Sequence, residues 1–435
     1  MAEPTYHFDT LKIHAGYNPA DHNYAVSVPI YQTAAYELGS VARSDDLFSF
    51  NSEDSVYTRL SNPTITILEK RIAELHGATG AIALASGMAA VSYALLNVVG
   101  GSGRILTTPR LYGGTIDSFG QVYKEFGIEV DLVEDSDSVD SFEKAIRADT
   151  KAIFVESITN PNATVTDLEP VADLAHKYNI PLLVDNTVAT PYLLNPFDYG
   201  ADIIVYSATK ALTGHGNAIA GLVVENNQFN WANGKFPQFE EKLYSLRDID
   251  DRQRSVLEVF SKIPFTGRIR ALYLNYLGAA LSPFNAYLVL IGLETLSERI
   301  EKQVSNSKKV IRFLENRREV LWIKHPEAKE NPYRDLAKKY LPKGSGGIFS
   351  FGLSGTAEQR RNFIEGVKVF SYQANIGDAR SLIINPSRTT HTELDEEQQR
   401  LADIVPETIR LSIGLENAED LIADLDQAFE LAFQK

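Results

Sequence analysis

A lysine that follows a short apolar run is the most chemically promising residue of this chain. Lys210 closes the segment Ser-Ala-Thr-Lys, which comes directly after the run DIIVY. In extended backbone Ser207 and Thr209 point to one side and Lys210 to the other, so two hydroxyls could bind a phosphate while the amine faces a carbonyl. A lone lysine after a strand is more often a surface residue, but a desolvated lysine amine is suited to Schiff-base chemistry.

Other polar residues follow apolar runs in the same way. Asn160 follows IFVESI and Asp185 follows PLLV, where a carboxylate could hold a pyridine nitrogen protonated. Ser86-Gly87 follow AIALA, and the start of a helix there could bind an anion through free N–H groups. Tyr112, in LYGGT, is either a core residue or a ring that stacks on a cofactor. Taken singly, each also has a structural interpretation as a cap, turn or core residue.

These residues need a scaffold that brings strand ends together. From about residue 78 onward, short apolar runs alternate with amphipathic segments such as residues 168–178; the runs are AIALA, RILTT, IEVDLV, KAIFVE, PLLVD and DIIVYS. The alternation predicts an open α/β sheet with mostly parallel strands. Ligands of such sheets bind at the carboxyl ends of the strands, where the polar residues above are expected.

The pattern divides the chain into three parts. Residues 1–60 are predicted to form an N-terminal arm without long helices, and residues 61–282 the α/β domain, with an insertion over about 225–282. Ser282-Pro283 predicts a helix start before a long helical pattern. A smaller α+β domain is predicted over residues 283–435, from this helix, the strand candidates GGIFSFGL and TIRLSI, and a last helix over 418–433. The uncharged stretch 78–103 is interpreted as strand, turn and buried helix, not as a membrane span.

Composition narrows the classes of function. The 435 residues carry a formal net charge of −15, which makes a nucleic-acid partner unexpected. The chain contains no cysteine, which excludes disulfides, thiolate metal sites and a cysteine nucleophile. No His-rich ligand spacing predicts a metal site, and His215 is interpreted as a hydrogen-bonding loop residue. The first ten residues show no signal-peptide pattern, so we expect a cytoplasmic protein with no membrane partner.

The order of the motifs is more specific than any one of them. Seven segments follow one another along the chain: YTRLSNPT, SGMAA, LYGGT, ESITNP, VDNT, DIIVYSATKALTGHG and IRLSIGLEN. In this order they resemble the Cys/Met-metabolism family of pyridoxal-phosphate (PLP) enzymes over almost the whole chain. The resemblance implies the PLP-dependent transferase fold of the aspartate-aminotransferase type (fold type I), and a homo-oligomer, either a dimer with shared active sites or a tetramer.

The resemblance also implies roles for individual residues. PLP would be held as a Schiff base on Lys210, which also moves protons, with Asp185 beside its ring nitrogen and Tyr112 stacked on the ring. The phosphate would be bound by Ser86, Gly87, Met88, Ser207 and Thr209, and by Tyr57 and Arg59 of a neighbouring subunit. The substrate carboxylate is expected at Asn160, Ser381 and Arg410, with Asn160 also near the cofactor.

Within the family, the chain most resembles the O-acetylhomoserine sulfhydrylase branch. The segments that carry this likeness are FNWANGKFP, LSPFNAYLVLIGLETLSERIE, NPYRDLAKKYLPKGSGGIFSFGL and NPSRTTH. They imply a γ-replacement in methionine and cysteine biosynthesis, in which O-acetyl-L-homoserine and sulfide, or a small thiol, give L-homocysteine, or methionine, and acetate. Four positions depart from the expected residues, either through subfamily drift or through an altered entrance charge: Ala211, Asn275, Gln303 and Arg388.

Three alternatives stay open from the sequence. Cystathionine γ-synthase or γ-lyase would use the same type of site on another thiol or with another outcome. Methionine γ-lyase is expected to carry a cysteine where this chain has Gly114. A PLP-binding protein without turnover would not need Lys210, Asp185 and Arg410 together.

Overall fold

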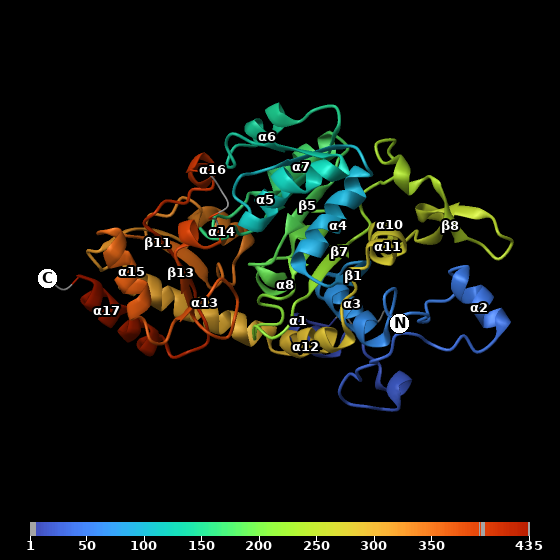
Figure 1. Ribbon diagram of the computed structural model, residues 1–435, viewed down its shortest axis with the longest axis horizontal. Coiled ribbons are helices and arrows are strands. Elements are labelled where there is room, and N and C mark those ends of the chain that lie inside the picture. Colours follow the sequence, from blue (N-terminus) through green and yellow to red (C-terminus); the bar gives the residue numbers. More distant parts are fainter. Residues whose placement is uncertain (1–5, 391, 393–395, 434–435) are drawn as a thin grey trace.

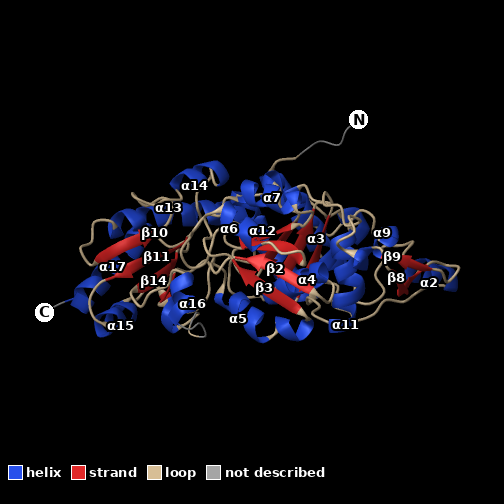
Figure 2. Ribbon diagram, turned by 90° about the horizontal axis from the view of Figure 1, so that it is seen from above, coloured by secondary structure: helices blue, strands red, loops and turns tan. Residues whose placement is uncertain are grey.

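The computed structural model describes residues 6–390, 392 and 396–433. Within this part of the chain a seven-stranded sheet occupies the middle of the molecule, and a five-stranded sheet lies towards the C-terminus (Figure 1). A two-stranded hairpin lies at the opposite end, beside α2 (Val41–Phe48) (Figure 2). The arrangement confirms the predicted large α/β domain followed by a smaller C-terminal α+β domain.

The central sheet is built from the Val- and Ile-rich runs of the sequence. β2–β3, β2–β4, β4–β5 and β5–β6 pair in parallel, whereas β7 is antiparallel to β6 and β1. The carboxyl ends of β4, β5 and β6 therefore share one edge of the sheet. The strands follow in the order β1 (Gly80–Leu84), β7 (Gly221–Glu225), β6 (Ile203–Ser207), β5 (Leu182–Asp185), β4 (Thr150–Glu156), β2 (Gly103–Thr107) and β3 (Ile128–Leu132).

Helices cover both faces of this sheet, which explains why its strands are apolar on both sides. In β1, Ile82 packs into the apolar layer of one face and Ala83 into that of the other. The layer of Ala83 contains α3 (Pro63–His76), α6 (Val139–Ala145), α7 (Leu168–Lys177), α8 (Thr190–Leu193) and α12 (Pro283–Glu294). The layer of Ile82 contains α4 (Gly87–Val99), α5 (Gly113–Gln121) and α10 (Pro264–Arg268).

The uncharged stretch 78–103 folds as predicted, with β1 and α4 joined by a short turn at Ala85-Ser86. Among the described residues, no helix is both long enough and apolar enough to cross a membrane. The long helix predicted after Ser282 is two helices instead, because Thr295 leaves helical geometry between α12 and α13 (Leu296–Leu314), with φ −119° and ψ 21°.

The smaller domain has an apolar core of its own. Its aromatic centre includes Phe349, Phe351, Phe363 and Phe429. Its sheet follows the order β10 (Val320–Lys324), β11 (Ile348–Leu353), β14 (Thr408–Ser412), β13 (Leu382–Ile384) and β12 (Ser371–Tyr372). Besides α13, its helices are α14 (Arg334–Tyr340), α15 (Ala357–Gly366), α16 (Glu396–Leu401) and α17 (Ala418–Phe433).

The predicted arm begins against its own chain. In α1 (Phe8–His14), the buried Lys12 donates hydrogen bonds to Ser297 and Glu298 of α13. Later, α2 (Val41–Phe48) lies near the hairpin of β8 (Lys242–Arg247) and β9 (Gln253–Ser255) (Figures 1 and 2). The rest of the insertion contains α9 (Val256–Val259), a π-helical turn over Ile269–Leu274 and α11 (Asn275–Leu277).

Candidate active site

Lys210 lies in the turn that follows β6, at the edge where the parallel strands end. Its Nζ atom donates a hydrogen bond of 2.7 Å to Oδ1 of Asn375, which belongs to the smaller domain. Burial and, to a smaller extent, the nearby positive charge of Arg410 together lower the pKa of Lys210 to about 8. A larger fraction of this amine is therefore neutral and nucleophilic at neutral pH than in an ordinary lysine.

The turn that carries Lys210 is held by a buried cation. Arg299 of α13 donates hydrogen bonds to the carbonyl oxygens of Ala211 at 2.8 Å and Gly292 at 2.5 Å. Burial lowers the pKa of Arg299 to about 10. Because these carbonyl groups are fixed from the side of α13, the backbone that presents Lys210 is tied to the connection between the domains.

Two carboxyl groups lie side by side at the ends of β4 and β5. Glu156 and Asp185 occupy paired positions of these parallel strands, so their side chains leave the sheet on the same face. The backbone N–H of Thr187 donates to Oδ1 of Asp185 at 2.9 Å. Burial raises the pKa of Asp185 to about 6, so this carboxylate would gain from a cationic partner such as a protonated ring nitrogen.

The start of α4 has the features of an anion site. Ser86 caps this helix, and its Oγ atom accepts a hydrogen bond from the N–H of Ala89 at 3.1 Å. The N–H groups of Gly87 and Met88 lie in the first turn, where helix geometry leaves them without intrahelical acceptors. A Cβ atom on Gly87 would lie 2.6 Å from Cβ of Ser207, so only glycine lets the helix start approach the end of β6.

Thr209 uses its hydroxyl within its own loop. Its Oγ1 atom donates to the carbonyl oxygen of Ala220 at 3.2 Å and accepts from the N–H of the same residue at 3.0 Å. Ser207 ends β6 beside Gly87, with its backbone N–H bound to Thr187. Of the two predicted hydroxyl donors, Ser207 thus lies directly against the helix start, whereas Thr209 supports the turn before Lys210.

Arg410 reaches the site from β14 of the smaller domain. Its guanidinium donates to Oδ1 of Asn160 at 3.1 Å and to the carbonyl oxygen of Asn375 at 2.9 Å. Its Nε atom is buried and has no hydrogen-bond partner within the described chain. Burial lowers the pKa of Arg410 to about 9, which leaves it charged at neutral pH. A buried arginine with an unused donor beside Lys210 is suited to bind a carboxylate.

The structure does not bring Ser381 to this group. Its hydroxyl donates to Glu416 at 2.8 Å and accepts from the N–H of Gly414 at 2.9 Å, inside the smaller domain. Asn375 lies between Lys210 and Arg410 instead. Asn375 was not among the residues predicted for the site, because it lies in a loop that follows none of the predicted strands.

Tyr112 and the two arm residues take different positions. Tyr112 precedes α5, its ring is partly exposed, and it lies close enough to Arg410 to influence that residue's pKa. Arg59 stacks over the ring of Tyr57 at 5.4 Å and donates to the carbonyl oxygen of Asn275 at 2.5 Å. In the described residues no hydrogen bond or ion pair joins Tyr57 or Arg59 to the strand ends of their own chain.

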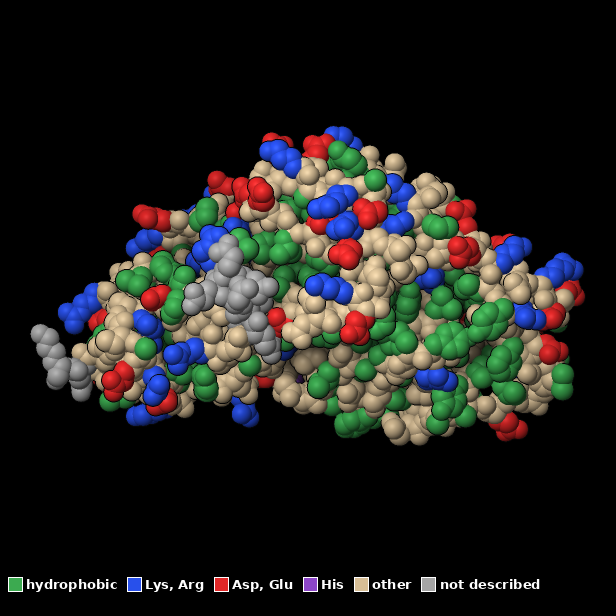
Figure 3. Space-filling model, turned by 45° about the horizontal axis from the view of Figure 1, so that its top comes forward, with side chains coloured by type: hydrophobic (Ala, Val, Ile, Leu, Met, Phe, Trp, Pro, Cys, Tyr) green, Lys and Arg blue, Asp and Glu red, His purple; other side chains and the backbone are tan. Residues whose placement is uncertain are grey.

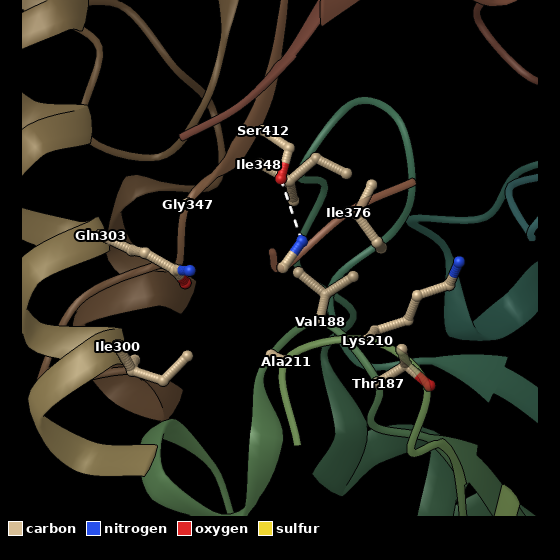
Figure 4. A pocket seen from close by; sticks show the side chains of 11 residues that line it. Thr187, Val188, Lys210, Ala211, Ile300, Gln303, Gly347, Ile348, Ile376 and Ser412 are labelled. Atoms are coloured by element: carbon tan, nitrogen blue, oxygen red, sulfur yellow. Dashed lines mark hydrogen bonds between the residues drawn. The ribbon is translucent and has the colours of Figure 1, made fainter. Parts of the chain in front are cut away.

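Two of the four departures lie together behind the lysine. Ala211 and Gln303 line a cavity of about 20 Å³ that also includes Ile300 and Ser412, and the Lys210 side chain points away from it (Figure 4). Gln303 closes one wall of this cavity by donating to the carbonyl oxygen of Asp378.

The other two departures lie elsewhere. Asn275 contributes the acceptor for Arg59, and Arg388 is exposed at the end of a short 3₁₀ helix. His215 bonds the carbonyl oxygen of Thr213, in line with its interpretation as a loop residue.

Glu156 was also missed by the sequence reasoning, although a signal was present. It is a charged residue at the end of an apolar run, as Asp185 is, and the same argument about the cost of burying a charge applies to it.

Comparisons with known proteins agree over nearly the whole chain. Residues 9–430 match the family of Cys/Met metabolism PLP-dependent enzymes. The O-acetyl-L-homoserine sulfhydrylase of Leptospira meyeri is 39% identical over 431 residues, which cover 97% of this chain and 96% of that protein. A sulfhydrylase of Gibberella moniliformis is 38% identical over 437 residues, covering both chains completely.

A solved structure is similar at the level of the fold. It comes from Campylobacter jejuni, is assigned as an O-acetylhomoserine (thiol)-lyase and carries a pyridoxyl-lysine phosphate. The two structures superpose with a TM-score of 0.92 at 39% sequence identity, over 98% of this chain and 100% of that one.

The residues of the site fit PLP. Lys210 offers an amine of lowered pKa, Asp185 a carboxylate that would gain from a ring N–H, and the start of α4 a seat for a phosphate that a Cβ atom on Gly87 would obstruct. The spare Nε donor of Arg410 leaves a place for the carboxylate of an amino acid. This fit, with the match over residues 9–430, shows that the chain belongs to the Cys/Met metabolism family of PLP-dependent enzymes.

Proposed function

We propose that the protein catalyses a γ-replacement in which O-acetyl-L-homoserine and sulfide give L-homocysteine and acetate. The observation that carries the proposal is the junction of the two domains. Lys210 of the larger domain donates to the side-chain Oδ1 atom of Asn375 at 2.7 Å. Arg410 of the smaller domain donates to the backbone carbonyl oxygen of the same residue at 2.9 Å. A proton-transferring amine thus lies next to a carboxylate-binding guanidinium. The sulfhydrylase relatives indicate which amino acid and which nucleophile use this pair.

PLP, when bound, supplies an electron sink that stabilises negative charge at the substrate's Cα atom. Arg410, with Asn160 beside it, holds the substrate carboxylate and so fixes Cα near Lys210. With PLP bound, the Lys210 amine would accept one proton at a time: it takes the Cα proton, gives it up within the site, and in its neutral form then takes a Cβ proton, after which the Cγ–O bond breaks with release of acetate. Sulfide forms the new Cγ–S bond, and protons return to Cβ and Cα. Atoms and charge balance without a further co-reactant.

The division between replacement and elimination is directly measurable. With O-acetyl-L-homoserine and sulfide, we expect homocysteine to exceed 2-oxobutanoate, because the sulfhydrylase-like insertion and Gly114 favour the replacement route. Both products are quantified over a series of sulfide concentrations, with cysteine as an alternative nucleophile to detect cystathionine formation. A mixture dominated by 2-oxobutanoate at every sulfide concentration would refute the proposal.

We also propose that each active site is completed by a second copy of this chain. Tyr57 and Arg59 lie at an exposed position beside Asn275, and large apolar side chains gather over the same half of the molecule, around α2, α11 and the β8–β9 hairpin (Figure 3). The exposed apolar residues there include Val41, Phe48, Tyr244, Ile249, Tyr276 and Leu277. A surface of this kind supports burial against a partner, and a closed dimer would bring Arg59 to the other chain's phosphate seat.

The cytoplasmic location and the domain boundaries stay predictions.

Subunit mixing tests the shared site. Lys210→Ala and Arg59→Ala chains, each of low activity alone, are exchanged into hybrids. In a shared-site dimer one pocket carries both defects and the other neither, so random mixing restores about a quarter of the wild-type activity. The control mixes Lys210→Ala with Asp185→Asn, whose defects belong to the same pocket, and no recovery is expected. Verified Lys210–Arg59 hybrids without recovery would exclude the shared site.

A further inference from the structure

A second carboxyl group lies in the floor of the site and has no role in the reaction described above. Glu156 is the last residue of β4, only 6% of its surface is exposed, and it sits in register with Asp185 on the adjacent strand. Burial raises the pKa of Glu156, and the neighbouring Asp185 raises it further. Burying such a group is costly, so it must make contacts that an apolar side chain could not make.

Those contacts are two backbone N–H groups that flank the site. One oxygen of Glu156 accepts from the N–H of Tyr112 at 2.5 Å, and the other accepts from the N–H of Asn160 at 3.0 Å. Tyr112 is the residue that precedes α5 and lies near Arg410, and Asn160 contacts Arg410 through its side chain at 3.1 Å. One carboxyl group thereby joins two loops that come from different strands of the sheet.

We propose that Glu156 is a positioning residue that fixes the ring of Tyr112 over the cofactor site and the amide of Asn160 against Arg410. This inference rests on the function proposed above. Both oxygens are in use, so the role needs a side chain with two acceptors and the reach of glutamate. Loss of the bond to Tyr112 would loosen the hold on the cofactor ring. Loss of the bond to Asn160 would loosen the grip of Arg410 and Asn160 on the substrate carboxylate.

Two substitutions test this geometry. Glu156→Gln keeps the length but replaces one acceptor with an NH₂ group, which leaves one backbone N–H without an acceptor. Glu156→Asp keeps both acceptors but is one methylene shorter, so it cannot reach both N–H groups. We expect both variants to bind PLP less tightly and to raise KM for the amino-acid substrate, on the order of tenfold to a hundredfold, while KM for sulfide stays unchanged.

Glu225 supplies a matched control. It is fully buried at the end of β7 and also accepts from two backbone N–H groups, those of Phe265 at 3.0 Å and Thr266 at 2.7 Å. Because β7 is antiparallel to β6, Glu225 pairs with Ile203 at the start of β6. It therefore lies at the ends of the strands opposite to those that carry Asp185. Glu225→Gln should lower thermal stability as Glu156→Gln does, but leave PLP affinity and both KM values as in the wild type.

Hydrogen–deuterium exchange of the cofactor-free proteins gives a readout that needs no substrate. In Glu156→Gln, the amide of Tyr112 or Asn160 should exchange at least about tenfold faster than in the wild type. In Glu225→Gln, the change should be confined to Phe265 and Thr266. This readout holds whichever amino acid the enzyme uses, so it separates a failure of this inference from a failure of the proposed function.

Three results would overturn the positioning role. One is wild-type exchange, PLP affinity and KM in a folded Glu156→Gln protein. Another is a wild-type-like Glu156→Asp beside a defective Glu156→Gln, because charge and not reach would then matter. The third is a Glu225→Gln protein with the same active-site defects, because those would then follow from general destabilisation.

Discussion

Lys210→Ala is expected to abolish turnover and to leave PLP without its covalent link to the protein. Among the described residues the Lys210 amine is the only lysine nitrogen that bonds Asn375, and burial with the nearby Arg410 lowers its pKa to about 8. Loss of a residue that transfers protons costs on the order of 10²–10⁴-fold in rate, and loss of covalent attachment adds to that. Borohydride reduction of the wild-type holoenzyme, followed by peptide mapping, should place the pyridoxyl label on Lys210.

The control for this experiment is another partly buried lysine. Burial also lowers the pKa of Lys151, but it lies near the start of β4, at the opposite edge of the sheet. Its Nζ atom donates to the carbonyl oxygen of Lys235. Lys151→Ala should keep the absorbance of bound PLP and the wild-type rate. A label on any residue other than Lys210 would show that the assignment is wrong.

Asp185→Asn is expected to lower the rate by about a hundredfold or more, a barrier increase of about 2.7 kcal/mol, while the fold stays intact. An amide cannot hold the ring nitrogen of PLP protonated, so negative charge at Cα loses its electron sink. The amide can still accept from the N–H of Thr187, which preserves the local turn. Exchange of the substrate's Cα proton in deuterated water measures the affected step directly.

Asp202→Asn is the matched control for this substitution. Asp202 is buried just before β6 and accepts from the N–H of Leu182 at 2.8 Å, at the other edge of the sheet. Its change to asparagine should affect stability and leave Cα-proton exchange at the wild-type rate. Near wild-type exchange in Asp185→Asn would contradict the role of Asp185.

Strand positions were predictable because each run is short, apolar and β-branched. The run before Lys210 and the run ending at Asp185 are β6 and β5, displaced by a single residue at most. β7 was not anticipated. Thirteen residues separate Ser207 from Gly221, and they form turns and loop, not the helix by which a parallel strand is usually reached; β7 accordingly runs antiparallel to β6.

The positions of Lys210, Asp185 and Ser86-Gly87 were predictable because each follows an apolar run that forms a strand, whereas the position of Asn375 on the substrate side was not. Asn375 reaches Lys210 from a loop whose position depends on how the two domains pack, and no local pattern encodes that packing. Ser381 was expected at the substrate carboxylate with Asn160 and Arg410, on the basis of the family resemblance. Its hydroxyl is bound instead by Glu416 and Gly414, a pairing that appears only when β13 and β14 lie together.

The separate apolar core of the smaller domain has a consequence for how the enzyme fails. Phe349, Phe363 and Phe429 pack in a cluster that excludes the residues around β5 and β6, so the two halves of the site depend on different cores. Partial denaturation of the smaller domain's sheet, with the first half of α13 and its Arg299 still packed on the larger domain, would remove Arg410 and Asn375 while Lys210 and Asp185 keep their places. Enzyme preparations damaged by mild heat would then stay yellow yet fail to capture substrate, so colour alone would overstate the amount of competent protein.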